Sequence, residues 1–320
     1  MNDQVRRRRE LAVTGLPIDC AAAETAGDAR FGTELAPRAL RRAGLMLALT
    51  GAKDDGDLVT RIVGQTRDPV TGVLGWPSVA NVTSQVRART DNIVRSGRLP
   101  VLLGGCCTLL PGALAGARDA LAGGRPSAPG ALAGGRQLGL AYLDGHLDLC
   151  DGRTSPTGEA ADMPIAVISG HGPGPWSKML GAPVVSPARL KLVGPRDRAD
   201  AGVMGSVLPE QAGLSAELDP AALRAEGLAE AGQRVAAELA SSGGQYWVHL
   251  DVDVLDEDEF PATDYPMPGG LTWPELTSLL LPMTQSAALI GFSLAGYSPE
   301  QDPGGAAARS LVDLLQVALA

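Results

Sequence analysis

The sequence lacks several features that mark whole classes of protein. No apolar run in its 320 residues approaches the length of a membrane-spanning helix. The net charge is −9 and Arg6 to Arg9 form the only basic cluster, so neither nucleic acid nor an anionic membrane is an expected partner. The segment after these arginines is too short, and too broken by Gly15 and Pro17, to be a signal-peptide core. We therefore expect a cytoplasmic protein.

Cysteine is scarce as well. Four cysteines in a chain of 320 residues do not form a disulfide framework. In a reducing compartment, each of Cys20, Cys106, Cys107 and Cys150 is expected to be a small core residue, a metal ligand or a reactive thiol.

The hydrophobic residues, 45% of the chain, predict alternating strands and helices. Short apolar runs such as residues 10–16 and 138–143 alternate with amphipathic stretches such as 78–96 and 304–320, and a short strand is expected near residues 58–63. This order is typical of an α/β fold in which helices cover both faces of a mostly parallel sheet. No boundary or repeat divides the chain, so we expect one domain over residues 1–320. Residues 123–136, rich in Gly, Pro and Ala, are expected to be a flexible insertion.

The most informative stretch is LGLAYLDGHLDLC at residues 138–150, where an apolar strand leads directly into polar residues. If the chain stays extended, Asp144, His146 and Asp148 project to the same side because side chains alternate along a strand. Ionisable groups so close to an apolar strand destabilise one another unless a cation joins them. The stretch therefore predicts a metal site.

A second strand, at residues 245–251, also ends in acidic residues, Asp251 and Asp253, and carries His249 on the same face. Ligands of parallel sheets gather at the carboxyl ends of the strands, so the fold can bring both motifs into one pocket. Together the motifs supply four carboxylates, too much negative charge for one divalent ion and suitable for two. Oxygen-rich ligation favours manganese, magnesium or iron over copper.

These motifs resemble those of the ureohydrolase family, which includes arginases, agmatinases and formimidoylglutamases. YLDGHLD at 142–148 resembles the family's D-x-H-x-D motif, and residues 250–270 resemble its D-x-D segment with a trailing P-x-P-G-G. Weaker similarity covers residues 15–19 and 192–197 and much of the remaining chain. The resemblance implies a three-layer α/β/α arginase-like domain and usually a homo-oligomer. It also implies two Mn²⁺ per chain, with Zn²⁺ or Fe²⁺ as alternatives, and hydrolysis of a guanidinium or amidine carbon by a hydroxide between the metals.

The same resemblance assigns the metal ligands. Cys107, in the turn GGCCT, stands where the family's G-G-D-H-S turn places a histidine. A thiolate is a competent but softer ligand. Asp144 and Asp251 would join the two ions. The remaining ligands would be His146 and Asp253 for one ion, and Cys107 and Asp148 for the other.

The sequence departs from the family at the residues that handle substrate and protons. Ala161, in TGEAAD at 157–162, replaces the proton-shuttle histidine, and Gly296 stands where a glutamate usually holds the guanidinium. Candidates for the missing acid or base are Asp162, Glu159 and His249, although His249 could instead support a metal-binding carboxylate. Candidate substrate-binding residues are Thr157, Cys150, Tyr265 and Tyr297.

The expected activity is therefore cleavage of a C–N bond in a small guanidino or amidino compound. The cysteine turn and the GEAADM loop resemble a branch that includes hydroxyarginine hydrolases, which makes N-hydroxyarginine the specific candidate. Two alternatives stay open. The chain could be a zinc amide hydrolase of related fold, or a non-catalytic paralogue that binds a metabolite or a partner enzyme.

Overall fold

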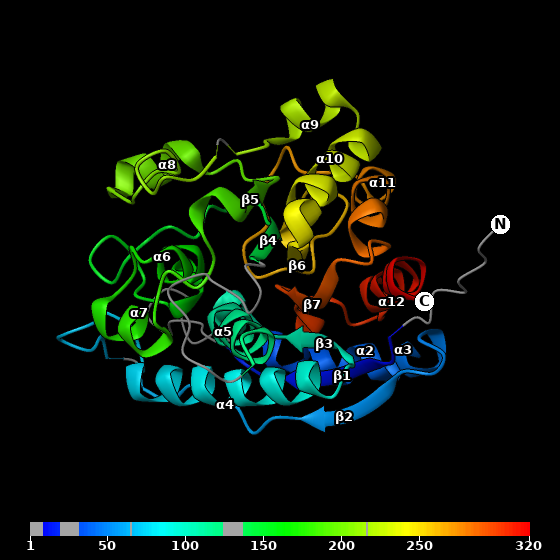
Figure 1. Cartoon of the computed structure of the whole chain (residues 1–320), viewed down its shortest axis with the longest axis horizontal. Helices are drawn as coiled ribbons and strands as arrows, with labels where there is room; N and C mark the ends of the chain where they lie inside the picture. The colour runs from blue at the N-terminus through cyan, green and yellow to red at the C-terminus, as the bar shows by residue number, and fades with distance from the viewer. Residues whose placement is uncertain (1–8, 20–31, 65, 124–136, 216) are drawn as a thin grey trace.

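A seven-stranded parallel sheet organises the chain in the computed structural model, which describes residues 9–19, 32–64, 66–123, 137–215 and 217–320. The strand order is β2-β1-β3-β7-β6-β4-β5 (Figure 1). The strands are β1 (Leu11–Leu16), β2 (Lys53–Asp57), β3 (Leu99–Gly104), β4 (Leu138–Leu143), β5 (Leu190–Val193), β6 (Gln245–Asp251) and β7 (Leu289–Ala295).

Helices cover both faces of this sheet, as Figure 1 shows. One apolar core packs beneath α4 (Trp76–Arg95), α5 (Leu110–Leu121), α6 (Pro164–Ser169) and α7 (Gly174–Leu180). The other packs beneath α2 (Ala36–Arg42), α3 (Leu45–Ala48), α10 (Leu228–Ala240), α11 (Trp273–Thr284) and α12 (Ala306–Leu319). Two shorter helices, α8 (Arg198–Met204) and α9 (Pro220–Glu226), follow β5.

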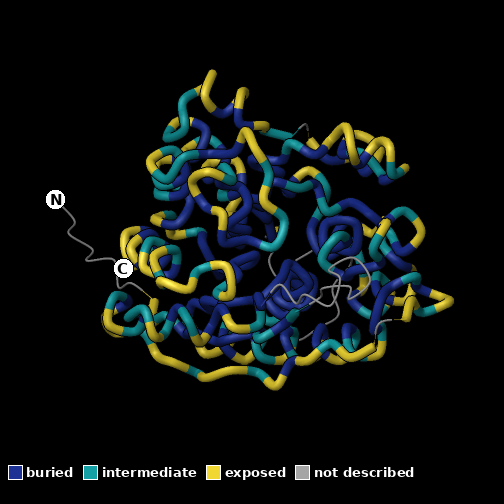
Figure 2. The backbone as a smooth tube through the Cα atoms, turned by 180° about the vertical axis from the view of Figure 1, so that it is seen from behind, coloured by how far each residue is buried: buried dark blue, intermediate teal, exposed yellow. Residues whose placement is uncertain are grey.

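The central strands are apolar on both sides because each side meets a helical layer. In β4, Leu140 and Tyr142 belong to the core beneath α4 and α5, whereas Ala141 and Leu143 belong to the core on the other face. In Figure 2 the buried segments lie in the interior of the molecule and the exposed residues lie on its outside. The expected three-layer α/β/α fold is confirmed.

One expected strand was misplaced. The edge strand β2 occupies Lys53–Asp57 rather than residues near 58–63. Its sequence KDDGD is not apolar, because an edge strand needs no burial on both faces. Ion pairs hold it instead, with Arg41 Nε 2.8 Å from Asp54 and Arg98 Nη1 2.9 Å from Asp55.

Two sequence expectations stay predictions. All but the first residue of the insertion expected at 123–136 lie outside the described residues. The single domain is supported by one sheet that includes both the first and the last strands of the chain. Within the described residues, no helix is long and apolar enough to cross a membrane.

Leu140→Ala should test the buried sheet, since Leu140 is 0% exposed. The cavity left by the substitution should lower the free energy of unfolding by about 2–5 kcal/mol. Leu47→Ala is the matched control: Leu47 is 86% exposed, and its loss should cost less than about 0.5 kcal/mol. Urea denaturation followed by circular dichroism measures both, and equal effects would contradict the assigned core.

Candidate metal centre

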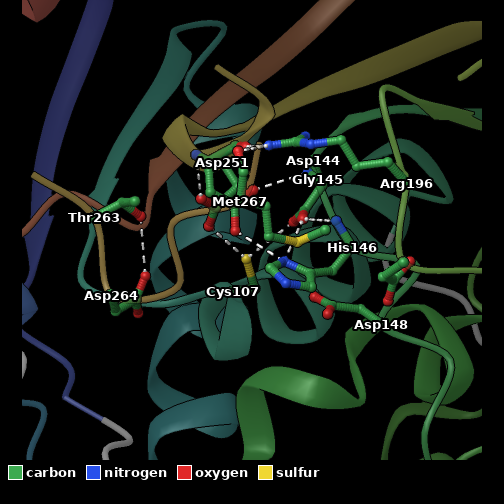
Figure 3. A network of polar contacts seen from close by, with 12 residues as sticks. Cys107, Asp144, Gly145, His146, Asp148, Arg196, Asp251, Thr263, Asp264 and Met267 are labelled. Atoms are coloured by element: carbon green, nitrogen blue, oxygen red, sulfur yellow. Dashed lines mark hydrogen bonds and ion pairs between the residues drawn. The ribbon is translucent and has the colours of Figure 1, made fainter. Parts of the chain in front are cut away.

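Both acidic motifs lie at the carboxyl edge of the sheet. Strands β4 and β6 are neighbours with Leu143 opposite Leu250, so the residues that follow them lie side by side. Cys107 reaches the same edge from the 3-10 helix Cys107–Leu109, which follows β3 and leads into α5. Figure 3 shows the side chains of Cys107, Asp144, His146 and Asp251 converging there.

The convergent side chains form two groups that could each hold a metal ion. The first, here the cysteine group, comprises Cys107, Asp144, His249 and Asp251; the second, the His146 group, comprises Asp144, His146 and Asp253. Within each group the candidate ligand atoms all lie within 4.8 Å of one another. Asp144 belongs to both groups, so the two sites are adjacent.

Backbone hydrogen bonds aim the carboxylates. Asp144 Oδ1 accepts from the backbone N–H of His146 at 2.7 Å, and Asp253 Oδ1 accepts from that of Gly145 at 2.8 Å. Asp251 caps the turn after β6 by accepting from the N–H of Asp253 at 3.0 Å. The guanidinium of Arg196 donates to the carbonyls of Asp253 and Met267, at 2.8 and 2.9 Å, and so ties the following loop to this edge. The hydrogen bond from Gly145 to Asp253 therefore ties the two acidic motifs, at residues 144–148 and 251–253, to each other.

The electrostatics of the centre are unfavourable without a cation. Burial, followed by the charge of Asp253, raises the pKa of Asp144 to about 6, and burial raises the pKa of Asp251 well above its usual range. Burial, Asp251 and Asp144 raise the pKa of the Cys107 thiol. Burial also acts to raise the pKa of Asp253, but the nearby His146 overcomes it and the pKa is lowered. Oxygen, nitrogen and sulfur donors crowded together at such cost fit a bound metal.

Asp148 departs from the expected arrangement. Among the residues that the structure describes, neither candidate group includes it. The prediction that Asp144, His146 and Asp148 project from one extended strand was wrong, because β4 ends at Leu143 and Asp148 has φ +49°. Its carboxylate accepts a hydrogen bond from the hydroxyl of Tyr142. Asp148 still lines the cavity beside the centre, and its ligand role stays a prediction.

A cavity of about 190 Å³ opens beside the two groups. Three of the four predicted substrate-binding residues, Cys150, Thr157 and Tyr265, line it together with Asp162. Asp162 accepts from the hydroxyls of Ser155 at 2.5 Å and Thr157 at 2.9 Å. Its pKa is raised because burial outweighs these hydrogen bonds.

The other predicted catalytic and substrate residues, Glu159, His249 and Tyr297, do not line this cavity. Glu159 lies behind Tyr265, which lines the cavity and whose hydroxyl donates to Glu159 Oε2 at 3.0 Å. Tyr297 donates to Asp302 Oδ2 at 2.8 Å and lines a different surface cavity, so the structure does not bring it to the centre. His249 is fully buried, and burial lowers its pKa to about 3. Its imidazole is therefore neutral and faces Cys107.

Sequence reasoning missed Asp264, which lines the cavity and is half-buried. Burial, followed by the charge of Asp253, raises the pKa of Asp264 to about 7. Asp264 lies directly before Tyr265, but only the fold brings it close to Asp253. The structure also explains Gly296: its φ is +83°, and an added Cβ would collide with the carboxylate of Asp251. A glutamate cannot take this place without a shift of the centre.

The two other cysteines that the structure describes behave differently from each other. Cys150 is free and buried, as is Cys107. Cys106 is disulfide-bonded and also belongs to the apolar core beneath α4 and α5, so the expected core position is confirmed for it.

Donor side chains gathered at the carboxyl edge of a parallel sheet define a candidate metalloprotein of the open α/β class. Residues 9–320 match the model of the Arginase family. The chain belongs to the Arginase family.

Individual relatives agree with this assignment. The chain is 25% identical to an arginase of Staphylococcus aureus (strain MRSA252) over 317 residues, which cover 97% of this chain and 96% of the relative. An arginase of Agrobacterium fabrum is 26% identical, with 97% and 91% of the two chains covered. The solved structure of arginase from Bacillus caldovelox superposes with a TM-score of 0.80 at 23% identity, covering 97% of each chain. That of the agmatine ureohydrolase of Thermoplasma volcanium gives 0.66 at 19% identity, covering 97% and 88%; these two structures support the fold alone.

The raised pKa of Asp144 predicts how the metal-free protein responds to pH. Between the usual carboxyl pKa of 3.8 and about 6, the folded state keeps a proton that the unfolded state has released, so stability falls as pH rises through this range. Asp144→Asn should remove that loss, making the metal-free protein about 1–3 kcal/mol more stable at pH 8. Thermal denaturation in EDTA measures the effect.

Adding Mn²⁺ should reverse the order, stabilising the unmodified protein and leaving Asp144→Asn unchanged. Asp313→Asn, on the exposed face of α12, is the matched control and should behave like the unmodified protein. If Mn²⁺ stabilised the Asp144→Asn variant as much as the unmodified protein, Asp144 would not be a ligand.

Proposed function

We propose that the chain is a hydrolase with two metal ions that cleaves a C–N bond of a guanidino or amidino compound. The observation that carries the proposal is the pair of donor groups that share Asp144 beside a small cavity. Membership of the Arginase family and relatives named as arginases support the same chemistry.

The donors that would hold the ions are the predicted set of Cys107, Asp144, His146, Asp148, Asp251 and Asp253. Manganese suits the His146 group, which offers two carboxylates and one imidazole. When bound, two such ions supply a water activated for attack at a trigonal carbon. The protein's contribution is to fix the carboxylates through the backbone N–H groups of His146, Gly145 and Asp253.

The cavity residues would bind the substrate and supply the proton that the leaving amine needs. Asp162 is the best-placed acid: it lines the cavity, and its raised pKa favours the protonated form more than an exposed carboxyl does. Ser155 and Thr157 keep its carboxyl in position. Glu159 acts on the substrate only through Tyr265, to which it is hydrogen-bonded.

N-hydroxyarginine is the specific substrate we propose. An ordinary guanidinium is fully cationic, and the position that commonly supplies a carboxylate to hold it is Gly296. An N-hydroxylated guanidine is less basic than an ordinary guanidine, so a smaller fraction of it is cationic. Its binding therefore needs fewer carboxylates to balance its charge. The cavity acids outside the proposed donor set are Asp162, Asp197 and Asp264; the pKa of each is raised, which suits a less charged group.

A substrate panel tests this function. Protein loaded with Mn²⁺ should release ornithine and hydroxyurea from N-hydroxyarginine at least about tenfold faster, in kcat/KM, than it releases ornithine and urea from arginine, a difference of about 1.4 kcal/mol in the barrier. Liquid chromatography with mass detection measures all products. Asp253→Asn should lose at least about 100-fold in kcat because it removes one donor of the His146 group.

Asp313→Asn again serves as the matched control and should retain full activity. No turnover of any guanidino or amidino compound by metal-loaded protein would favour the non-catalytic alternative. Turnover of an amide alone would favour the amide hydrolase.

A further inference from the structure

The second histidine of the centre has no place in the ligand set implied by the family resemblance. That set completes the ion beside Cys107 with Asp148, yet the described donor atoms that surround the Cys107 sulfur include His249 and exclude Asp148. His249 Nε2 lies 3.3 Å from Cys107 Sγ. The position of this imidazole therefore needs a separate explanation.

His249 is held in one orientation by its neighbours. Its Nδ1 lies 2.7 Å from Oγ of Ser293, which is directly opposite His249 in the pairing of β6 and β7. The indole N–H of Trp247 donates to the same Oγ at 2.9 Å, which leaves Oγ able either to accept from Nδ1–H or to donate its own hydrogen to Nδ1, and a metal at Nε2 requires the first arrangement. Tyr142 stacks on the imidazole at 5.0 Å with an interplanar angle of 6°. These contacts hold the imidazole with Nε2 directed at the cysteine group.

The spacing of the cysteine group matches a tetrahedral metal site. Cys107 Sγ lies 3.0 Å from Asp251 Oδ2 and 3.5 Å from Asp144 Oδ2, in addition to 3.3 Å from His249 Nε2. Zinc bonds of about 2.3 Å to sulfur and about 2.0–2.1 Å to nitrogen or oxygen place tetrahedral ligands about 3.5 Å apart. The separations of 3.3 Å from His249 and 3.5 Å from Asp144 lie close to that value, and the 3.0 Å separation from Asp251 is shorter.

We propose that His249 is a metal ligand and that Cys107, His249, Asp144 and Asp251 form a site with one sulfur, one nitrogen and two oxygen donors that prefers Zn²⁺ to Mn²⁺. This deepens the proposed function, since it concerns one of the two ions on which that function rests. Thiolate and imidazole select softer cations, whereas the His146 group, with no sulfur and two carboxylates, suits a harder cation such as Mn²⁺. The centre would then hold two different metals.

A metal-free interpretation of the same pair is a cysteine nucleophile activated by a histidine base. The two carboxylates argue against it, because negative charge 3.0 and 3.5 Å from the sulfur opposes formation of a free thiolate. A cation between the four donors removes this opposition. The metal site is therefore the interpretation that the charges favour.

Metal binding by the full-length protein tests the proposal without any assay of hydrolysis. Loaded with one equivalent of Co²⁺, the protein should show an ultraviolet thiolate-to-metal charge-transfer band. Cys107→Ser should abolish the band, whereas Cys150→Ser, at the other free buried thiol, should keep it. A band that is absent from the unmodified protein, or that survives Cys107→Ser, overturns the proposal.

Zinc affinity tests the role of His249. His249→Ala should weaken Zn²⁺ binding at least about 100-fold in a competition with a chromogenic chelator, and Ser293→Ala should weaken it about 10–100-fold by releasing the imidazole. His171→Ala, at an exposed histidine, is the matched control and should bind as the unmodified protein does. Unchanged affinity in a folded His249→Ala variant overturns the proposal.

X-ray absorption of unmodified protein with one equivalent of Zn²⁺ avoids the risk that a variant fails to fold. It should detect one sulfur at about 2.3 Å together with imidazole scattering. A zinc ion with no sulfur neighbour, or rapid alkylation of Cys107 by iodoacetamide in the zinc-loaded protein, overturns the proposal. The two hypotheses fail separately: a sulfur-bound metal without hydrolysis refutes the proposed function, and hydrolysis by protein whose metal lacks sulfur refutes this assignment.

Discussion

Mutual repulsion among buried acidic groups is the constraint on which the site depends. Asp144, Asp251 and Asp253 are each nearly inaccessible to solvent, and Cys107 lies against two of them. Such a cluster costs free energy in the empty protein, and the rest of the molecule holds it in place through backbone hydrogen bonds and the apolar cores on both sides of the sheet. The cluster lowers the free energy of unfolding of the metal-free protein, and a bound cation would raise it again.

The parallel sheet makes this concentration of charge possible. The carboxyl ends of all the strands lie at the same edge, so residues that are distant in sequence meet there. Helices on both faces exclude water, which strengthens every electrostatic interaction at the centre. Arg196 then joins the loop after β6 to the strand ends without forming a direct ion pair with the two donor groups, because it binds carbonyl oxygens.

Departures from the family motifs occur both among the donors of the centre and beside its cavity. The His146 group offers donors that suit a hard ion, while the turn after β3 and the strand β6 bring a sulfur and an imidazole into the cysteine group. Ala161 and Gly296 remove polar side chains from the substrate side, and Asp264 and Tyr265 add others there. The proposed ligands and the proposed substrate contacts therefore both depart from the family motifs.

The sequence by itself determined the three-layer fold and the two acidic motifs, because apolar runs that alternate with amphipathic stretches are local patterns. It also found Cys107, whose place in the turn after β3 is fixed by chain order. Tertiary structure decided the rest. That His249 faces Cys107 follows from Ser293 on the neighbouring strand, and that Asp148 leaves the donor groups follows from the end of β4 at Leu143. Tyr297 donates to Asp302 and lies away from the cavity, whereas Asp264 lines it. Tertiary contacts set the direction of these side chains, and no local sequence pattern encodes such contacts.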